Sequence, residues 1–186
     1  MNLSRCRRFT FMSQRRSLIE TPPNLAPLTI RRMNAADLGQ VIAIDQRSFS
    51  LPWPISSFQY ELAHNESSRC WVAEIQSEKG AKVVAMAVVW FIIDEVHIAT
   101  IAVMPEYRGR KIGQKLLAAL LKDAVMAGAQ HAFLEVRETN LAARSMYQKF
   151  GFQEAGKRPH YYSDTQEDAV LMNLEPIDLQ VIESLE

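Results

Sequence analysis

Hydrophobic and polar residues follow the two spacings that strands and helices require along most of the chain. Apolar segments rich in β-branched residues predict strands at 28–32, 69–75, 82–93, 96–103, 131–137, 152–161 and 168–174. Apolar residues three and four positions apart predict helices at 35–49, from a cap at Ser56 or Ser57 to about 64, at 109–127 and at 141–150. Asn34 is expected to cap the first helix, because its side chain can accept a hydrogen bond from the first turn.

The order of these elements indicates the fold class. The breaks at 77–80 and at Asp94–Glu95 are typical of hairpin turns, so the middle strands should be antiparallel. The later strand, helix, strand run adds a parallel connection. The pattern therefore predicts an α/β (α+β) domain with a central mixed, mostly antiparallel sheet of about seven strands and about four flanking helices.

The predicted helix at 109–127 has the clearest amphipathic pattern, and Gly128 follows as a C-terminal stop. Its buried stripe should consist of Ile112, Leu116, Leu117, Leu120, Leu121 and Ala124. A stripe of this length predicts a helix that packs along the sheet.

The 186 residues suit one sizeable core. We expect the folded domain at 28–175, a tail at 176–186, and a disordered basic extension at 1–27 that ends in a proline-rich stretch. Its Arg- and Ser-rich composition also occurs in organelle transit peptides, and a start codon placed upstream is a further interpretation. It lacks the apolar core of a secretory signal.

Charge is distributed unevenly. Residues 1–19 hold five of the 21 basic residues and no acid, which leaves 16 basic and 21 acidic residues in the remainder, a net charge of −5. An acidic body argues against nucleic acid as a direct partner and suits a cationic amine or basic peptide, although it is also an ordinary solubility charge.

Other sequence features indicate where the protein is located and what it binds. The longest apolar run, 83–93, is too short to span a membrane. Cys6 and Cys70 lack the spacing of a metal site or disulfide framework, which favours a reduced, cytoplasmic location. We expect no metal, because His64, His97, His131 and His160 show no ligand spacing. The sequence leaves the oligomeric state open and slightly favours a monomer.

The segment 101–114 joins a buried strand to the start of the amphipathic helix. Helix starts bind anions because their first N–H groups are unpaired. Gly109 and Gly113 allow close backbone approach, and Arg108, Arg110 and Lys111 add positive charge. The spacing matches neither a Walker loop nor a dinucleotide fingerprint. The segment thus predicts a phosphate site of another kind, although an ordinary basic helix start would have the same composition.

This segment resembles the coenzyme A loop of the GCN5-related N-acetyltransferase (GNAT) superfamily, [QR]-x-x-G-x-[GA]. Arg108 and Gly113 match its first and last positions, whereas Lys111 replaces the middle glycine. The segment 138–152 resembles the superfamily's N-x-x-A-x-x-[LM]-Y-x-x-x-G-F block, and the two blocks occur in the family's order. The resemblance implies the GNAT fold and acetyl-CoA as co-substrate.

Three further segments are similar to one branch, the ribosomal-protein-alanine N-acetyltransferases (RimI). They are Arg47–Trp53, Leu134–Arg137, and His160–Tyr162 followed by Glu167–Ala169. This resemblance covers roughly 28–175. It implies a protein N-terminus, from a ribosomal protein, as the acceptor.

Two residues are candidates for proton transfer. Strand alternation places Glu135 on one face with Phe133 and Arg137, and the resemblance makes it the general base, working through water. The alternative is a surface glutamate paired with Arg137. The resemblance makes Tyr147 the general acid for the coenzyme A thiolate, and the alternative is a tyrosine packed in the core.

The resemblance also implies the residues that bind coenzyme A. The backbone of Ile101, Ala102 and Val103 would pair with the pantetheine arm. The pyrophosphate would meet Arg108, Gly109, Arg110, Lys111, Ile112, Gly113 and Gln114. Asn140 is expected to cap the helix that bears Tyr147 and to contact the coenzyme.

Residues for the acceptor are less strongly indicated by the sequence. Trp53, Tyr161 and Tyr162 would wall a groove for an extended peptide, or pack as ordinary core. Glu95 would hold the incoming ammonium, or be a solvated turn acid. The resemblance therefore implies an enzyme that acetylates an N-terminal alanine. The alternatives are a GNAT enzyme for a small amine and a non-catalytic module that binds acetyl-CoA or docks on the ribosome.

Overall fold

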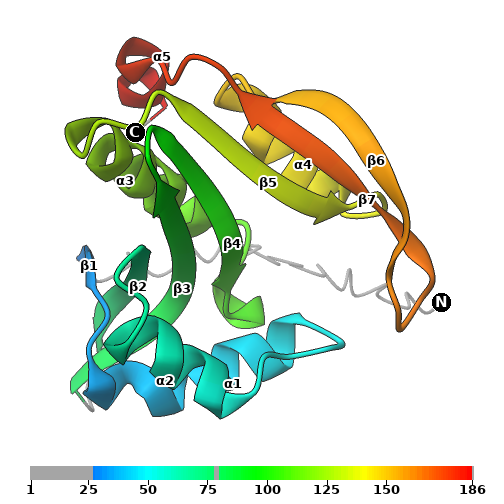
Figure 1. The fold of residues 1–186 in the computed structure, drawn as a ribbon. Helices are drawn as coiled ribbons and strands as arrows, with labels where there is room; N and C mark the ends of the chain where they lie inside the picture. Colours follow the sequence, from blue (N-terminus) through cyan, green and yellow to red (C-terminus); the bar gives the residue numbers. More distant parts are fainter. Residues whose placement is uncertain (1–26, 78–79, 186) are drawn as a thin grey trace, which may run out of the picture.

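The computed structural model describes residues 27–77 and 80–185, which form one seven-stranded sheet with helices on both faces (Figure 1). The strands are β1 (Leu28–Arg32), β2 (Ser68–Ser77), β3 (Gly80–Ile92), β4 (Glu95–Val103), β5 (His131–Arg137), β6 (Gln153–Tyr162) and β7 (Glu167–Leu174). The helices are α1 (Leu38–Ser48), α2 (Ile55–Ala63), α3 (Ile112–Met126), α4 (Leu141–Lys149) and α5 (Leu179–Ser184), with 3-10 turns η1 (Ala35–Asp37) and η2 (Pro105–Tyr107). The predicted mixed, mostly antiparallel sheet is confirmed.

The strand order is β1-β2-β3-β4-β5-β7-β6, and every neighbouring pair is antiparallel except β4 and β5. The parallel pairing joins residues 95–98 to residues 131–134 and then ends. Beyond it the two strands diverge, so that β5, β6 and β7 lean away from the rest of the sheet (Figure 1). We call this opening the strand gap.

A β-bulge marks the start of the strand gap. Val88 on β3 pairs with Thr100, but Val89 pairs with Ile98, which leaves Ala99 as an extra residue on β4. A bulge bends its strand and increases the local twist. The bend therefore turns the end of β4 away from β5.

The two faces of the sheet carry different helices. α3 packs on β2, β3 and β4 from one side, and its predicted stripe is buried throughout, from Ile112 to Ala124. α1 and α2 cover the other side through a second cluster that includes Val41, Ile44 and Phe58. From Ala85 to Val89, alternate residues of β3 belong to alternate clusters, as strand geometry requires.

Helix boundaries differ from the predicted ones at two positions. α3 begins at Ile112 rather than 109, because Gly109 (φ 74°) and Lys111 (φ 59°) have left-handed backbone conformations. α2 is preceded by Pro54 rather than capped by Ser56 or Ser57, which lie in its first turn. The Asn34 cap is confirmed, since its side chain accepts from the Ala36 N–H at 2.9 Å.

The segment predicted as a C-terminal tail contains α5. Asp178 caps this helix through the Gln180 N–H at 2.8 Å, and Ile182 is fully buried in the main core. α5 contacts α3, and the Gln114 side-chain amide donates to the Leu185 carbonyl at 2.5 Å. These residues therefore belong to the folded domain.

Two expectations concern residues that the structure does not describe. The predicted extension lies outside the described residues except for its last position, and Cys6 lies outside them too. Within the described part of the chain, each helix is too short or too polar to cross a membrane.

Candidate active site

A groove of about 460 Å³ runs along the end of β4, the turn before α3 and the start of α4. Of the residues predicted to bind the coenzyme, all but Arg110 line it: Ile101, Ala102, Val103, Arg108, Gly109, Lys111, Ile112, Gly113, Gln114 and Asn140. Tyr147 lines it as well. We call it the larger cavity. The two sequence blocks, about thirty residues apart, thus meet at one surface.

The strand gap explains why the backbone of β4 can bind a ligand here. The ladder between β4 and β5 ends at Ile98, so residues 101–103 have no strand partner on that edge. Backbone N–H and C=O groups need hydrogen-bond partners. An extended, amide-containing chain laid along this edge would supply them as an added strand does.

The turn before α3 has the features that the sequence analysis associated with an anion site. Its first intrahelical hydrogen bond runs from the Lys115 N–H to the Lys111 carbonyl at 3.0 Å, so the preceding N–H groups are free of helical partners. Gly113 lets the helix approach β4, since a Cβ there would lie 3.3 Å from Val103 Cγ2 and 3.6 Å from Met146 Sδ. The helix start therefore offers N–H groups and positive potential at close range.

The basic residues of this turn have different roles. Arg108 is held by the protein itself: its Nε donates to the Val103 carbonyl at 3.0 Å and its Nη2 to Ser48 Oγ at 3.1 Å. Arg110 does not line the cavity, and its guanidinium carbon lies 5.4 Å from the Tyr107 ring centroid. Lys111 does line it, in a left-handed conformation rather than the right-handed helical one that a non-glycine residue prefers.

Tyr147 lies on α4, which Asn140 caps by accepting from the Ala143 N–H at 3.2 Å. The tyrosine is 5% exposed, and its ring centroid is 5.7 Å from that of Phe152. Burial raises the pKa of its phenol above the ordinary value, and the nearby Tyr162 phenol adds to the rise. Among the described residues the hydroxyl has no hydrogen-bond partner, so its proton is available to a ligand.

Glu135 lines a second, smaller cavity of about 260 Å³, with Trp90, His97, Ile98, Ala99, Phe133, Leu134, Arg158, Leu171 and Asn173. Its Oε1 lies 3.0 Å from Arg158 Nη1. The alternative partner considered from the sequence, Arg137, instead contacts Asp164 and Glu167. The carboxylate is therefore a cavity residue held by a cation from β6.

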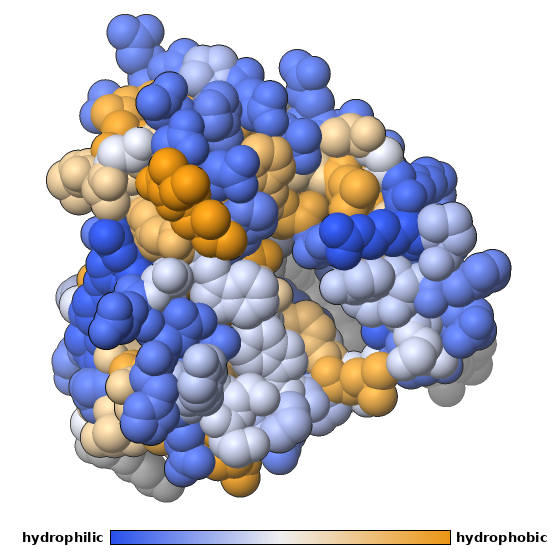
Figure 2. Space-filling model, in the orientation of Figure 1, coloured by the Kyte–Doolittle hydropathy of each residue, from blue (hydrophilic) through white to orange (hydrophobic). Residues whose placement is uncertain are grey.

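Glu135 and Tyr147 lie on opposite faces of β5. Tyr147 belongs to the core that contains Leu134 and Val136, and strand alternation turns Glu135 to the other face. Both cavities adjoin the strand gap, because residues 97–99 of β4 line the smaller one and residues 101–103 line the larger one. Figure 2 shows the molecule hollowed between the half that carries α1 and α2 and the half that carries β6 and β7.

The residues predicted to contact the acceptor lie around these cavities rather than in them. The Trp53 ring centroid lies 5.3 Å from that of Phe58, and the Trp53 backbone N–H donates to Asp45 Oδ2 at 2.7 Å, so Trp53 packs against the cluster that α1 and α2 form. Glu95 Oε2 lies 2.7 Å from His97 Nε2, and its side chain is 40% exposed.

Tyr161 and Tyr162 stand edge to face at the end of β6, with ring centroids 5.2 Å apart. Tyr161 is 48% exposed. Tyr162 is less exposed, and burial raises its pKa to about 12.

Several lining residues were not predicted. Ser48, Phe49, Tyr107, Ala142, Ala143 and Met146 line the larger cavity. All six fall within the segments that carried the family resemblance, so the sequence did contain a signal for them. Arg158 had no such signal, because it meets Glu135 only through sheet pairing. The described residues include no group of three or more His, Cys, Asp or Glu arranged to hold a metal ion.

Comparison with known proteins agrees with this fold. The family model described as "Acetyltransferase (GNAT) family" matches residues 38–152. The chain belongs to this family, and it is an acyltransferase of the N-acetyltransferase type.

Two relatives and one crystal structure are similar to most of this chain. The chain is 34% identical over 153 residues, 81% of its length and 99% of the relative's, to the [Ribosomal protein bS18]-alanine N-acetyltransferase of Escherichia coli strain K12. It is 35% identical over 143 residues, 77% of its length and 92% of the relative's, to a putative enzyme of the same name from Bacillus subtilis. The crystal structure of the ribosomal-protein-S18-alanine N-acetyltransferase from Escherichia coli matches with a TM-score of 0.72 and 32% identity, over 82% of this chain and 95% of that one.

Proposed function

We propose that this protein transfers the acetyl group of acetyl-CoA to the α-amine of an N-terminal alanine, on a small-subunit ribosomal protein. The names of the Escherichia coli and Bacillus subtilis relatives support this acceptor, because the similarity extends over nearly their whole length. The observation that carries the proposal is the placement of Glu135 and Tyr147 in two cavities that both adjoin the strand gap.

In the proposed reaction acetyl-CoA occupies the larger cavity. The pantetheine amides would pair with the open edge of residues 101–103, and the pyrophosphate would meet the N–H groups at the start of α3. Lys111 would add charge near the pyrophosphate. This arrangement would point the thioester toward the strand gap.

The acceptor would enter from the smaller cavity. An α-amine has an ordinary pKa near 8, so a carboxylate is a sufficient base near neutral pH. Glu135 would take the amine proton, directly or through water, while the nitrogen attacks the thioester carbonyl and the carbon–sulfur bond breaks. The incoming ammonium would replace Arg158 as a partner of this carboxylate.

Tyr147 would complete the reaction by protonating the departing thiolate. Its raised pKa keeps the phenol protonated at neutral pH, and the basic thiolate is able to accept the proton. The products would be coenzyme A and an N-terminally acetylated protein without its terminal charge.

A thiol-release assay on the full chain tests this function. The acceptors are peptides that begin with Ala, Ser, Met or Gly, a blocked peptide with an internal Lys, and spermidine. Release that needs a free peptide N-terminus and is fastest for Ala supports the proposal. Release only with spermidine or internal Lys would keep the enzyme class and overturn the acceptor, and tight coenzyme binding without release would favour a non-catalytic module.

A further inference from the structure

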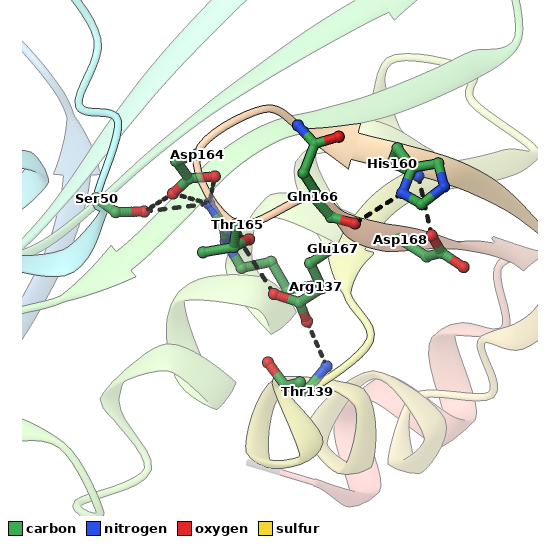
Figure 3. A network of polar contacts seen from close by, with 9 residues as sticks. All are labelled: Ser50, Arg137, Thr139, His160, Asp164, Thr165, Gln166, Glu167 and Asp168. Atoms are coloured by element: carbon green, nitrogen blue, oxygen red, sulfur yellow. Dashed lines mark hydrogen bonds and ion pairs between the residues drawn. The ribbon is translucent and has the colours of Figure 1, made fainter.

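Arg137 is the centre of a polar network that neither proposed proton transfer uses (Figure 3). It lies at the end of β5, on the same face as Glu135. Its Nη2 donates to both carboxylate oxygens of Asp164, at 2.9 and 2.8 Å. Its Nη1 donates to Thr165 Oγ1 at 2.8 Å and to Glu167 Oε2 at 3.3 Å. The guanidinium thereby holds the turn between β6 and β7.

The same guanidinium reaches the other half of the molecule. Ser50, in the loop between α1 and α2, accepts from Arg137 Nη2 at 3.1 Å and itself donates to Asp164 Oδ2. These contacts join two segments that the strand gap separates, as Figure 3 shows. The neighbouring residues Ser48 and Phe49 line the larger cavity. We call the Ser50–Arg137–Asp164 connection the strap.

Two further contacts link the network to the helix that carries Tyr147. Glu167 Oε1 accepts from the Thr139 N–H at 2.6 Å, immediately before the cap of α4. The guanidinium carbon of Arg137 lies 3.9 Å from the Tyr162 ring centroid, and the Tyr162 phenol influences the pKa of Tyr147. Arg137 thus contacts the Tyr162 ring near Tyr147, the α1–α2 loop and the β6–β7 turn.

The chemistry of the network requires an arginine. Arg137 faces the carboxylates of Asp164 and Glu167. Its side chain is 22% exposed, and each of the two acidic side chains is 14% exposed. Desolvation lowers the pKa of Arg137, but the hydrogen bonds from the guanidinium to Asp164 and Glu167 outweigh it. The planar guanidinium of an arginine can donate hydrogen bonds to several acceptors and stack on an aromatic ring at once, whereas a lysine ammonium cannot.

We propose that Arg137 is a positioning residue for acetyl transfer, because through the strap it holds the α1–α2 loop and the β6–β7 turn at a fixed separation. These two segments adjoin Trp53 and Tyr162, which were predicted to contact the acceptor, and Arg137 contacts the Tyr162 ring. This inference rests on the proposed function. It assigns Arg137 no contact with the reacting atoms. Loss of the strap should therefore weaken the binding of the peptide acceptor and lower the turnover.

The test compares Ser50→Ala, Arg137→Lys and Arg137→Gln with the matched control Ser163→Ala. Ser163 is exposed, lies next to Asp164 in the same turn, and its hydroxyl makes no hydrogen bond among the described residues. We expect Ser50→Ala to raise the KM for an Ala-starting peptide about 3- to 10-fold, as loss of a charge-assisted hydrogen bond would. Arg137→Gln should lower kcat/KM about 100-fold, with little rescue by lysine. In the control Ser163→Ala the KM for the peptide should stay within about twofold of the wild-type value.

Hydrogen exchange on the full chain supplies a readout that needs no activity. Ser50→Ala and Arg137→Gln should speed exchange at both 49–54 and 161–166, whereas Ser163→Ala should not. Unchanged exchange, or a peptide KM equal to that of the control, would overturn the positioning role. If wild type releases no thiol with any acceptor, the proposed function fails while exchange still decides whether the strap exists. If Arg137→Gln does not fold, Ser50→Ala carries the test alone.

Discussion

Arg158 Nη1 lies 3.0 Å from Glu135 Oε1, although their strands β6 and β5 are not neighbours. Arg158 crosses β7 to reach the carboxylate, and Leu171 of β7 pairs with Glu135 on the way. The proposed base is therefore held in the smaller cavity by a cation, and an incoming ammonium can take that cation's place.

Replacing the base should affect chemistry more than binding. We expect Glu135→Gln to lower kcat at least about 100-fold, the usual range for loss of a general base. The dissociation constant for acetyl-CoA should not change, because Glu135 does not line the larger cavity. Steady-state kinetics and calorimetry measure the two effects. Glu183→Gln, on the exposed side of α5, is the matched control, and an equal loss in both variants would count against the assignment.

Tyr147→Phe removes one hydroxyl from a buried position in the larger cavity. We expect a lower kcat, again by about 100-fold, with unchanged binding of acetyl-CoA. A single-turnover measurement at saturating coenzyme separates the two effects. Weaker coenzyme binding with normal turnover at saturation would rule out the acid role and favour the packing role.

The pKa of Tyr147 also predicts the pH profile. Burial raises this pKa above the ordinary value of about 10, so the phenol stays protonated throughout the neutral and mildly alkaline range. The acceptor α-amine loses its proton near pH 8. We therefore expect kcat/KM to rise toward pH 8 and to stay level to about pH 10. A decline below pH 10 that disappears in Tyr147→Phe would contradict a raised pKa.

Lys111 allows a comparison of two variants that lose the same charge. Its backbone is left-handed, with φ 59° and ψ 11°, which suits glycine and disfavours residues with a Cβ. Lys111→Gly should therefore be more stable than Lys111→Ala by about 1 kcal/mol, after the greater unfolded-state entropy of glycine is included. Chemical denaturation measures the difference. Equal stability would mean that the turn relaxes around alanine.

α5 offers a test of whether the last residues belong to the domain. Ile182 is fully buried, so Ile182→Ala should lower the free energy of unfolding by about 2–4 kcal/mol. Leu179→Ala, in the same helix at a site that is 36% exposed, should lower it by less than about 1 kcal/mol. Similar small losses in both variants would show that α5 contributes little to stability.

The sequence could predict the elements whose burial repeats along the chain. The stripe of α3 and the limits of β1 and β5 were visible because each buried face recurs at a regular spacing. Tyr147 was identified through a local block of residues. The short helix α5 was not predicted, because one fully buried residue in six gives no periodicity.

Contacts between distant segments could not be predicted in the same way. The pairing of Arg158 with Glu135 depends on sheet order, and the strap depends on two loops that meet across the strand gap. The left-handed Lys111 moved the start of α3 by three residues, since nothing in a lysine indicates that conformation. Trp53 packs on Phe58 because the chain bends at the prolines beside it, which a tryptophan alone does not reveal.

The most direct test of the proposed function is to map the acetyl group on one peptide that carries both an N-terminal alanine and an internal lysine. The full chain is incubated with this peptide and acetyl-CoA, and tandem mass spectrometry locates the modification. We predict acetylation of the α-amine by wild type, greatly reduced in Glu135→Gln and Tyr147→Phe. Acetylation of the lysine side chain, or equal α-amine labelling by wild type and both variants, would contradict it.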